Sequence, residues 1–257
     1  MRGKAGFSPI FITAAVSAVL LVAVAGWQIE SAMHARSTAG SYTAPTTEAG
    51  DSSAEGFASS TLASERSSTP IGSAVLDGIV SQYLSLQEKG LYTPEAGAKT
   101  AEKIAETLRA PVSYHSYAAA DITTSADTSY ARMLAYRADL QVSLAPLLKN
   151  TQPEYEIFAY YVSTKDKKNL EKLRAAAQNY RAAAGATAHV VPPKDALNEH
   201  LGILNSTEEF AATLDVLVAN ADDPFASVAA LRTYNQAEAD VLDSFSALAK
   251  YYREKKS

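Results

Sequence analysis

The sequence predicts an all-α protein in three parts: an N-terminal transmembrane helix at residues 7–28, a disordered stalk at residues 29–72, and an antiparallel bundle of six or seven helices at residues 73–254. Three observations predict this arrangement. An uncharged apolar run opens the chain, a segment rich in Ser, Thr, Ala and Gly follows, and the remainder repeats apolar residues every three or four positions. That spacing is typical of amphipathic helices, and no run alternates apolar and polar residues over the length of a strand.

The N-terminal run has the length of a membrane span. Residues 7–27 contain no charged side chain, and roughly 20 helical residues cross the hydrocarbon core of a bilayer. We expect Ser8 to cap this helix, Pro9 to occupy its first position and Trp27 to lie at the outer interface. The large apolar side chains of the expected anchor are Phe7, Ile10, Phe11, Ile12, Val16, Val19, Leu20, Leu21, Val22, Val24 and Trp27.

The charges before the run set its expected orientation. Arg2 and Lys4 would keep residues 1–6 in the cytoplasm by the positive-inside bias, so the remainder would lie outside the cell membrane. The alternative is a signal peptide with an apolar core at residues 10–22 and cleavage after Ala25, in an Ala-Val-Ala sequence, which would yield a secreted protein. The uninterrupted length of the run and the stalk behind it favour the uncleaved, single-pass anchor.

A short motif at the start of the run, Lys4-Ala5-Gly6-Phe7, resembles the processing site of type IV prepilins. In that family a basic leader ends in Gly before Phe and an apolar helix. The resemblance covers only these residues. The acidic residue that the family carries five positions into the mature helix is Phe11 here, so we build no function on this motif.

Residues 31–71 have a composition that favours disorder. Small and polar residues dominate and large apolar residues are nearly absent, so the segment buries too little surface to offset the entropy lost on ordering. We expect a flexible tether with a root-mean-square reach of roughly 35 Å. Such a tether would let a domain clear the lipid headgroups.

The first two expected helices are marked by their ends. Gly90 is a typical C-terminal cap of the first. Thr93, Pro94 and Glu95 form the N-cap, first-turn proline and acidic first turn of the second, which ends before Pro111. One apolar face is expected on each helix: Val75, Leu76, Ile79, Val80, Tyr83 and Leu84 on the first, and Ala101, Ile104, Ala105 and Leu108 on the second.

Prolines separate the next two helices. We expect a third helix from about Asp127 that Pro146 kinks or ends, and a short fourth helix that Pro153 opens. The inward side chains expected on the third are Tyr130, Met133, Leu134, Arg137, Leu140 and Leu144. The aromatic side chains of the fourth are Tyr155, Phe158, Tyr160 and Tyr161.

The last three helices are expected to be longer. The fifth covers residues 165–184 and is closed by Gly185, and an extended Val-Val-Pro-Pro link at residues 190–193 leads to the sixth at residues 195–219. Asp-Asp-Pro at residues 222–224 starts a seventh of up to ~30 residues. The expected inward residues are Leu170, Leu173, Ala177 and Tyr180 on the fifth; Leu197, Leu201, Leu204, Phe210, Leu214, Leu217 and Val218 on the sixth; and Phe225, Val228, Leu231, Tyr234, Ala237, Val241, Phe245, Leu248 and Tyr252 on the seventh.

Composition and motifs exclude several classes of function. A net charge of −5 with a pI near 5.4, spread along the chain, argues against a nucleic-acid-binding face. The absence of Cys excludes disulfides, thiolate metal sites and a thiol nucleophile. The sequence also lacks the Gly-x-Ser-x-Gly elbow of serine hydrolases and the glycine motifs that bind dinucleotides and nucleoside triphosphates.

Histidines and carboxylates give no catalytic or metal signature. Only His200 falls on an expected helix, and the residues three and four before it are Leu197 and Ala196, so the ligand spacing of a helical metal site is not met. We expect His200 to be partly buried and bonded to a neighbouring helix. The carboxylates expected on outer faces are Glu102, Glu106, Glu208 and Glu209, and Asp222 and Asp223 are expected at a helix cap. The sequence therefore predicts no catalytic residue, cofactor or metal.

Tyrosine is the unusual residue of the chain, with fourteen copies. Tyrosine suits protein interfaces, although most are expected at the wet edges of the bundle core. We expect a membrane-anchored extracytoplasmic domain that binds or scaffolds at the cell envelope, through membrane lipid and an envelope protein or wall polymer. The alternatives are a solute-binding or sensor-like bundle and a cell-wall-acting enzyme using carboxylates. A closed bundle would favour the first hypothesis, a buried polar cavity the second, and a cleft lined by Tyr and two close carboxylates the third.

Overall fold

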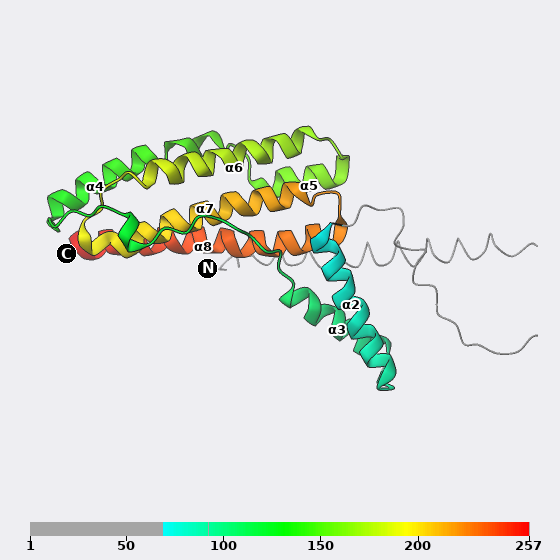
Figure 1. Cartoon of the computed structure of the whole chain (residues 1–257). Helices are drawn as coiled ribbons and strands as arrows, with labels where there is room; N and C mark the ends of the chain where they lie inside the picture. Colours follow the sequence, from blue (N-terminus) through cyan, green and yellow to red (C-terminus); the bar gives the residue numbers. More distant parts are fainter. Residues whose placement is uncertain (1–68, 92, 257) are drawn as a thin grey trace, which may run out of the picture.

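The computed structural model describes residues 69–91 and 93–256 (Figure 1). The expected anchor at residues 7–28 and the expected stalk up to residue 68 lie outside the described residues. Within the described ranges the regular structure is entirely helical, with seven α-helices, three short 3-10 helices and no strand. This confirms the helical bundle. Among these helices none is both long and apolar enough to cross a bilayer.

The elements follow one another with short connections, apart from one long segment between α3 and α4. The α-helices are α2 (Pro70–Glu88), α3 (Pro94–Thr107), α4 (Tyr130–Ser143), α5 (Glu154–Thr164), α6 (Lys168–Thr187), α7 (Leu197–Ala219) and α8 (Pro224–Lys256). The 3-10 helices are η1 (Ala119–Asp121), η2 (Ala145–Lys149) and η3 (Lys194–Ala196).

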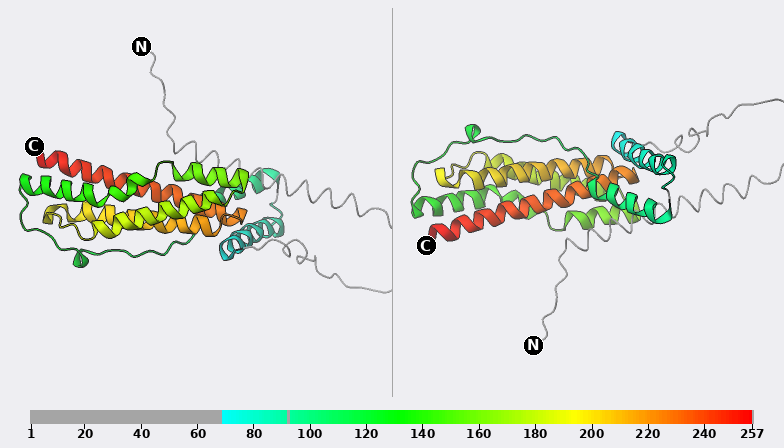
Figure 2. Two further views of the ribbon diagram at one scale, coloured as in Figure 1. Left: turned by 90° about the horizontal axis from the view of Figure 1, so that it is seen from above. Right: turned by 90° about the horizontal axis from the view of Figure 1, so that it is seen from below.

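The bundle consists of α6, α7, α8 and a broken rod made of α4, η2 and α5 (Figures 1 and 2). The helices α6, α7 and α8 run antiparallel in turn, and the broken rod lies along α6. The helices α2 and α3 form a hairpin, which we call the arm (residues 70–107), at the end of the bundle where α8 begins. The chain ends at the opposite end of the bundle, beside α4.

Alanine forms much of the contact between the long helices. Because its side chain is a single methyl group, helix axes can approach closely where it lines the interface. The larger core residues include Phe158, Leu173, Leu214, Leu217 and Tyr234, which are at most 2% exposed. The buried alanines are Ala176, Ala177, Ala183 and Ala184 on α6, Ala211 and Ala212 on α7, and Ala226, Ala229, Ala230 and Ala237 on α8.

A largely extended segment, which we call the strap (residues 108–129), runs along the bundle from α3 to α4 (Figure 2). Two side chains of the long helices bond to its backbone, and Glu209 on α7 also accepts from the Tyr114 hydroxyl at 3.3 Å. The Ala110 N–H donates to Thr233 Oγ1 on α8 at 2.9 Å. The Asn205 amide on α7 accepts from the Tyr117 N–H at 2.7 Å and donates to the Tyr117 carbonyl at 3.0 Å. These bonds satisfy backbone groups that no regular element pairs.

Most expected helix ends match the structure. Gly90 follows α2 with φ of +64°, α4 ends shortly before Pro146, and α5 begins after Pro153. Two ends differ. The helix α6 continues through Gly185 to Thr187, since this glycine keeps a right-handed backbone. The helix α2 begins at Pro70, before residue 73, because the Thr69 side chain caps it.

The expected inward face of α2 is wrong for most of its residues. Val75 is buried and Ile79 packs partly against the core. By contrast, four other side chains of this face are between 38% and 48% exposed, because they point away from the bundle or lie where the arm has left it. These exposed side chains are Leu76, Val80, Tyr83 and Leu84.

The expected inward face of α4 is rotated. Met133 and Leu140 are buried as expected, but Tyr130 and Leu134 are exposed, and Arg137 is exposed as well. Their place in the core is taken by Tyr136, which is fully buried. Its hydroxyl lies 3.2 Å from a histidine nitrogen on α7, and this polar partner makes burial of the tyrosine possible.

One carboxylate joins the start of α2 to the start of α8. Asp223 Oδ1 accepts from the N–H groups of Phe225 and Ala226, at 3.0 and 3.1 Å, and so caps α8. Asp223 Oδ2 accepts from the Thr69 N–H at 2.7 Å and the Thr69 hydroxyl at 2.9 Å. The same hydroxyl accepts from the Gly72 N–H at 3.1 Å and caps α2. We call this arrangement the clasp.

Replacing the carboxylate of the clasp should loosen the arm and destabilise the bundle. We expect Asp223→Ala to lower the free energy of unfolding by about 2 kcal/mol, since it removes a helix cap and leaves the Thr69 donors without their acceptor. Urea unfolding gives the first quantity, and limited proteolysis within residues 69–107 reports the loosening. Asp77→Ala, at an exposed position of α2, is the matched control.

A second variant tests the same contact from the other side. A Cβ on Gly72 would lie 2.0 Å from Asp223 Oδ2, so Gly72→Ala must displace the carboxylate. It should reproduce the proteolysis pattern of Asp223→Ala. Unchanged stability and proteolysis in both variants would show that the clasp does not hold the arm.

Candidate functional site

The arm exposes an apolar stripe on α2. Leu76, Val80 and Leu84 are spaced by four residues and lie on one side of the helix, with Tyr83 beside them. Leu91, in the turn after α2, is 60% exposed. We call these five side chains the α2 stripe. The only charged residues within α2 are acidic, Asp77 and Glu88, so the stripe is an apolar surface without a basic flank on its own helix.

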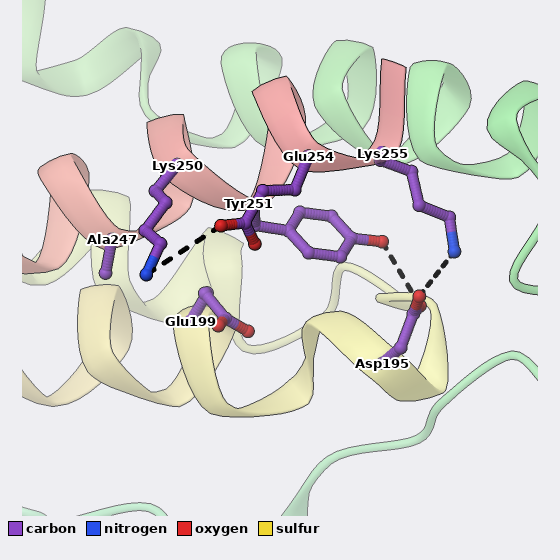
Figure 3. A pocket seen from close by; sticks show the side chains of 7 residues that line it. All are labelled: Asp195, Glu199, Ala247, Lys250, Tyr251, Glu254 and Lys255. Atoms are coloured by element: carbon purple, nitrogen blue, oxygen red, sulfur yellow. Dashed lines mark hydrogen bonds and ion pairs between the residues drawn. The ribbon is translucent and has the colours of Figure 1, made fainter. Parts of the chain in front are cut away.

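A groove lies between α7 and α8 near the C-terminal end of the bundle (Figure 3). Its volume is about 460 Å³, which falls in the range of small-molecule sites. The carboxylates of the groove come from both helices and from η3, whereas both lysines come from α8. The lining residues are Asp195, Glu199, Ala247, Lys250, Tyr251, Glu254 and Lys255.

One end of the groove is closed by hydrogen bonds. Asp195 accepts from the Tyr251 hydroxyl at 3.1 Å and from Lys255 Nζ at 2.5 Å. These contacts tie the last turns of α8 to η3. At the other end Lys250 Nζ lies 3.8 Å from Glu254 on its own helix.

A buried polar pair lies next to the groove along the chain. His200 follows Glu199 and is fully buried, with Nδ1 3.2 Å from the Tyr136 hydroxyl. This confirms the expected hydrogen bond to a neighbouring helix, and burial is complete rather than partial. Burial lowers the pKa of His200 to about 4. Its Nε2 is buried and has no hydrogen-bond partner among the described residues.

Two carboxylates lie near two tyrosines in the middle of the bundle. Glu154 is 8% exposed, accepts a hydrogen bond from Asn150 at 3.3 Å, and interacts with the nearby Tyr180. Tyr234 donates to Glu238 at 3.1 Å. Burial raises the pKa of the Glu154 carboxyl, and the nearby charge of Glu238 acts in the same direction. The groove of Figure 3 includes neither carboxylate.

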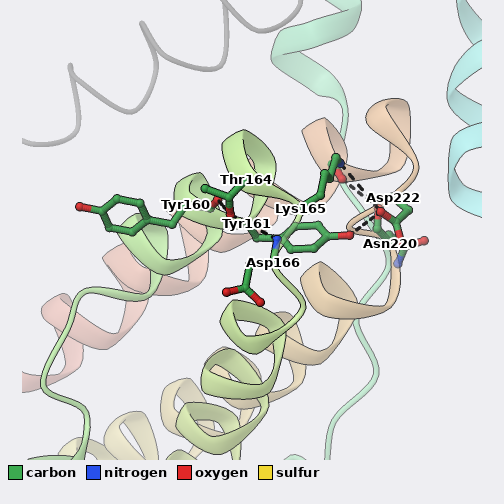
Figure 4. Close-up of polar contacts among 8 residues, drawn as sticks. Tyr160, Tyr161, Thr164, Lys165, Asp166, Asn220 and Asp222 are labelled. Atoms are coloured by element: carbon green, nitrogen blue, oxygen red, sulfur yellow. Dashed lines mark hydrogen bonds and ion pairs between the residues drawn. The ribbon is translucent and has the colours of Figure 1, made fainter.

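The turns at the other end of the bundle are joined by a tyrosine (Figure 4). The Tyr161 hydroxyl donates to Asp222, between α7 and α8. Lys165, the left-handed C-cap of α5, places its Nζ 3.8 Å from Asp222 and 5.0 Å from the centroid of the Tyr161 ring. Burial and the carboxylate raise the pKa of Tyr161 to about 12. Tyr160 points away from this contact (Figure 4), so these groups serve the fold.

The structure places the other residues considered from the sequence as follows. His115 and His189 are exposed. Glu208 and Glu209 are half-buried rather than solvated, and desolvation raises the pKa of both carboxyls. Among the described residues, no three His, Cys, Asp or Glu side chains are grouped so that they could hold a metal ion. The apolar residues of the expected membrane anchor lie outside the described residues.

Sequence reasoning missed both the groove and the α2 stripe. The groove depends on pairing residues 195–199 with residues 247–255, and no local pattern gives that pairing. The residues of the stripe are predicted as a core face because apolar periodicity does not show which surface, if any, covers a helix.

No family model, curated protein or solved structure matches this chain. Its function must therefore be argued from the geometry of the described residues.

The buried histidine should make the fold sensitive to acid. The unfolded chain binds a proton at His200 below pH about 6.5, whereas the folded chain does so only near pH 4. Stability should therefore fall as pH drops from 6.5 to 4, by about 3 kcal/mol from this residue. Urea unfolding at stepwise pH measures this. His200→Gln keeps a partner for Tyr136 and should flatten the dependence, and the exposed His189→Gln should not.

The buried Glu154 should give stability the opposite pH dependence. The pKa of Glu154 is raised in the folded state, so the folded chain binds this proton more tightly than the unfolded chain does. Stability should therefore fall as pH rises above the ordinary pKa of Glu. Glu154→Gln should remove this fall and stabilise the protein at pH 8. The matched control is Glu171→Gln, an exposed position on α6. Equal effects of the two variants would show that Glu154 carries no burial cost.

Proposed function

We propose that this protein is a membrane-anchored, extracytoplasmic binding or scaffolding domain, and that its arm holds another envelope protein. The observation that carries the proposal is the α2 stripe. It is a row of exposed apolar side chains on a helix that projects from an otherwise closed bundle. Large exposed apolar patches on soluble domains mark interaction sites.

The bundle interior supports binding at the surface rather than chemistry inside. Its long helices pack through alanine and leucine, and the buried polar side chains described above bond to other parts of the fold. His200 bonds to Tyr136, and Asp223 is used by the clasp. A closed bundle of this kind is the outcome that favours the binding hypothesis over an enzyme.

The composition of the stripe identifies the kind of partner. Apolar side chains spaced by three and four residues fit the grooves of another helix. The charges within α2, Asp77 and Glu88, disfavour anionic lipid headgroups and an anionic wall polymer, and the single lysine at the C-cap, Lys89, does not outweigh them. We therefore commit to a protein that presents an apolar helical surface.

The solute-binding hypothesis is favoured by one observation, the groove between α7 and α8. The enzyme hypothesis asks for two close carboxylates in a cleft lined by tyrosine. The groove is lined by Tyr251 and carries three carboxylates, but Asp195 is bound by Tyr251 and Lys255, and Glu254 lies 3.8 Å from Lys250. Glu154 and Glu238, which lie near Tyr180 and Tyr234, are not part of the groove. The second candidate function is therefore that of a solute-binding domain.

Site-directed photo-crosslinking in intact cells tests the proposal. A photoreactive amino acid at Val80, in the centre of the stripe, should crosslink one defined envelope protein, and the same protein should be captured from Leu84. Val142, which is 75% exposed on α4, is the control position and should not capture it. Leu76→Ser combined with Leu84→Ser should abolish the crosslink at Val80, since it makes the stripe polar.

Three outcomes would contradict the proposal. Capture of the same set of proteins from Val80 and Val142 would show non-specific contact. A product of twice the chain mass would identify a second copy as the occupant. Protection of the helical domain from external protease in intact cells, with the chain in the cytosolic fraction, would reject the envelope location.

A further inference from the structure

The solvent-facing side of α4 is apolar. Met133, Tyr136 and Leu140 face the bundle and are buried, whereas the opposite side of the helix carries no charged residue. The exposed side chains of that opposite side, which we call the α4 seam, are Ala131, Leu134, Ala135, Ala138, Gln141 and Val142. The water-facing side of a helix is ordinarily polar or charged, so the seam has the composition of a covered surface.

The middle of the seam is formed by small side chains. Ala131, Ala135 and Ala138 are spaced by three and four residues and lie on one side of the helix. A second helix could approach closely over them, as α6, α7 and α8 approach one another. Leu134 and Val142 lie one turn before and one turn after Ala138, and they are 43% and 75% exposed. The seam therefore fits another helix with an alanine-rich face.

The two flanks of the seam carry charges of opposite sign. Arg137 and Asp139 are both exposed and lie on opposite sides of Ala138, about 100° from it around the helix. The Arg137 guanidinium lies 5.9 Å from the centroid of the Tyr252 ring. Asp139 pairs with Arg132 at 3.8 Å, and its side chain is still 56% exposed. Both charges can therefore reach a second molecule at the seam.

We propose that the α4 seam binds a second copy of this chain, with the two α4 helices parallel about a two-fold axis. In a parallel pair each flank meets the opposite flank of the other copy, so Arg137 of each chain would meet Asp139 of the other. In an antiparallel pair identical flanks would meet, and Arg137 would face Arg137. The charges therefore favour the parallel pair.

The parallel orientation also agrees with the position of the arm. Because α4 runs along the bundle (Figure 2), a two-fold axis parallel to α4 keeps both arms at the same end. Two chains anchored in one membrane would require this arrangement. The inference does not depend on the partner of the arm, since the α2 stripe and the α4 seam lie on different helices.

The length of the seam predicts a weak, reversible dimer. The helix α4 has 14 residues and is about 21 Å long, whereas stable interfaces bury roughly 800 Å² on each partner. Association should therefore depend on concentration, and attachment to one membrane would raise the effective concentration of the two copies.

Disulfide crosslinking of the full-length protein in liposomes tests the proposal, because the chain has no cysteine of its own. In a parallel pair each residue of the seam lies opposite its own copy. Leu134→Cys, Ala138→Cys and Val142→Cys should therefore each give a product of twice the chain mass on oxidation. Ala175→Cys, at an exposed position of α6, is the matched control and should not.

Two further variants test the packing and the orientation. The dissociation constant, measured by analytical ultracentrifugation in detergent, should rise about 10-fold or more in Ala138→Glu, since two like charges would meet at the centre of the seam. It should rise by a similar factor in Arg137→Asp, since acidic flanks would then meet. Arg137→Asp combined with Asp139→Arg should restore association. Thermal unfolding of each variant checks that the fold is retained.

Four results would overturn the proposal. These are a monomer at every concentration without crosslinking at Ala138, equal crosslinking from Ala175, crosslinking only in a mixture of Leu134→Cys and Val142→Cys chains, and no rescue by the double exchange. The third result would show an antiparallel pair. A photoreactive residue at Val142 that captures a different protein would assign the seam to that protein, and the crosslink expected at Val80 would be unaffected.

Discussion

The close approach of α6, α7 and α8 is the constraint on which the rest of the structure depends. It requires a methyl side chain at successive contact positions, such as Ala177 on α6, Ala211 on α7 and Ala230 on α8, all fully buried. A larger side chain at any of these positions would have to push two helices apart or leave its preferred rotamer. Because the centre is tightly packed, any ligand or partner would have to bind at the surface, such as at the arm or at the groove between α7 and α8.

The arm and the bundle differ in what covers them. In the bundle most apolar side chains of α6, α7 and α8 meet a neighbouring helix, and Leu173 and Leu214 are fully buried. In the arm, α2 contacts α8 only over its first turns, so Val75 is buried while Leu84 is half exposed. The same sequence pattern thus stabilises the fold in one place and forms a candidate binding surface in the other.

The sequence predicted the helical class, the order of the helices and most of their ends, because these depend on local signals. Proline, glycine and the capping residues act within a single turn, as the match at Gly90 and Pro153 shows. The candidate sites could not be predicted in this way. Burial of Tyr136 in place of Leu134 depends on His200 in another helix, and the groove depends on residues about fifty positions apart along the chain. Gly185 shows the limit of such local signals, since a glycine allows a helix to end but does not force it to end.

The clasp also determines where a mechanical load enters the domain. Any pull on the chain N-terminal of Thr69 reaches the bundle first through the Asp223 carboxylate and the start of α8. The groove lies near the far end of the same helix, at Lys250 and Tyr251. Force applied to the chain ahead of Thr69 would therefore strain the root of the arm before it reached the groove, so the α2 stripe and the groove would bear different tension.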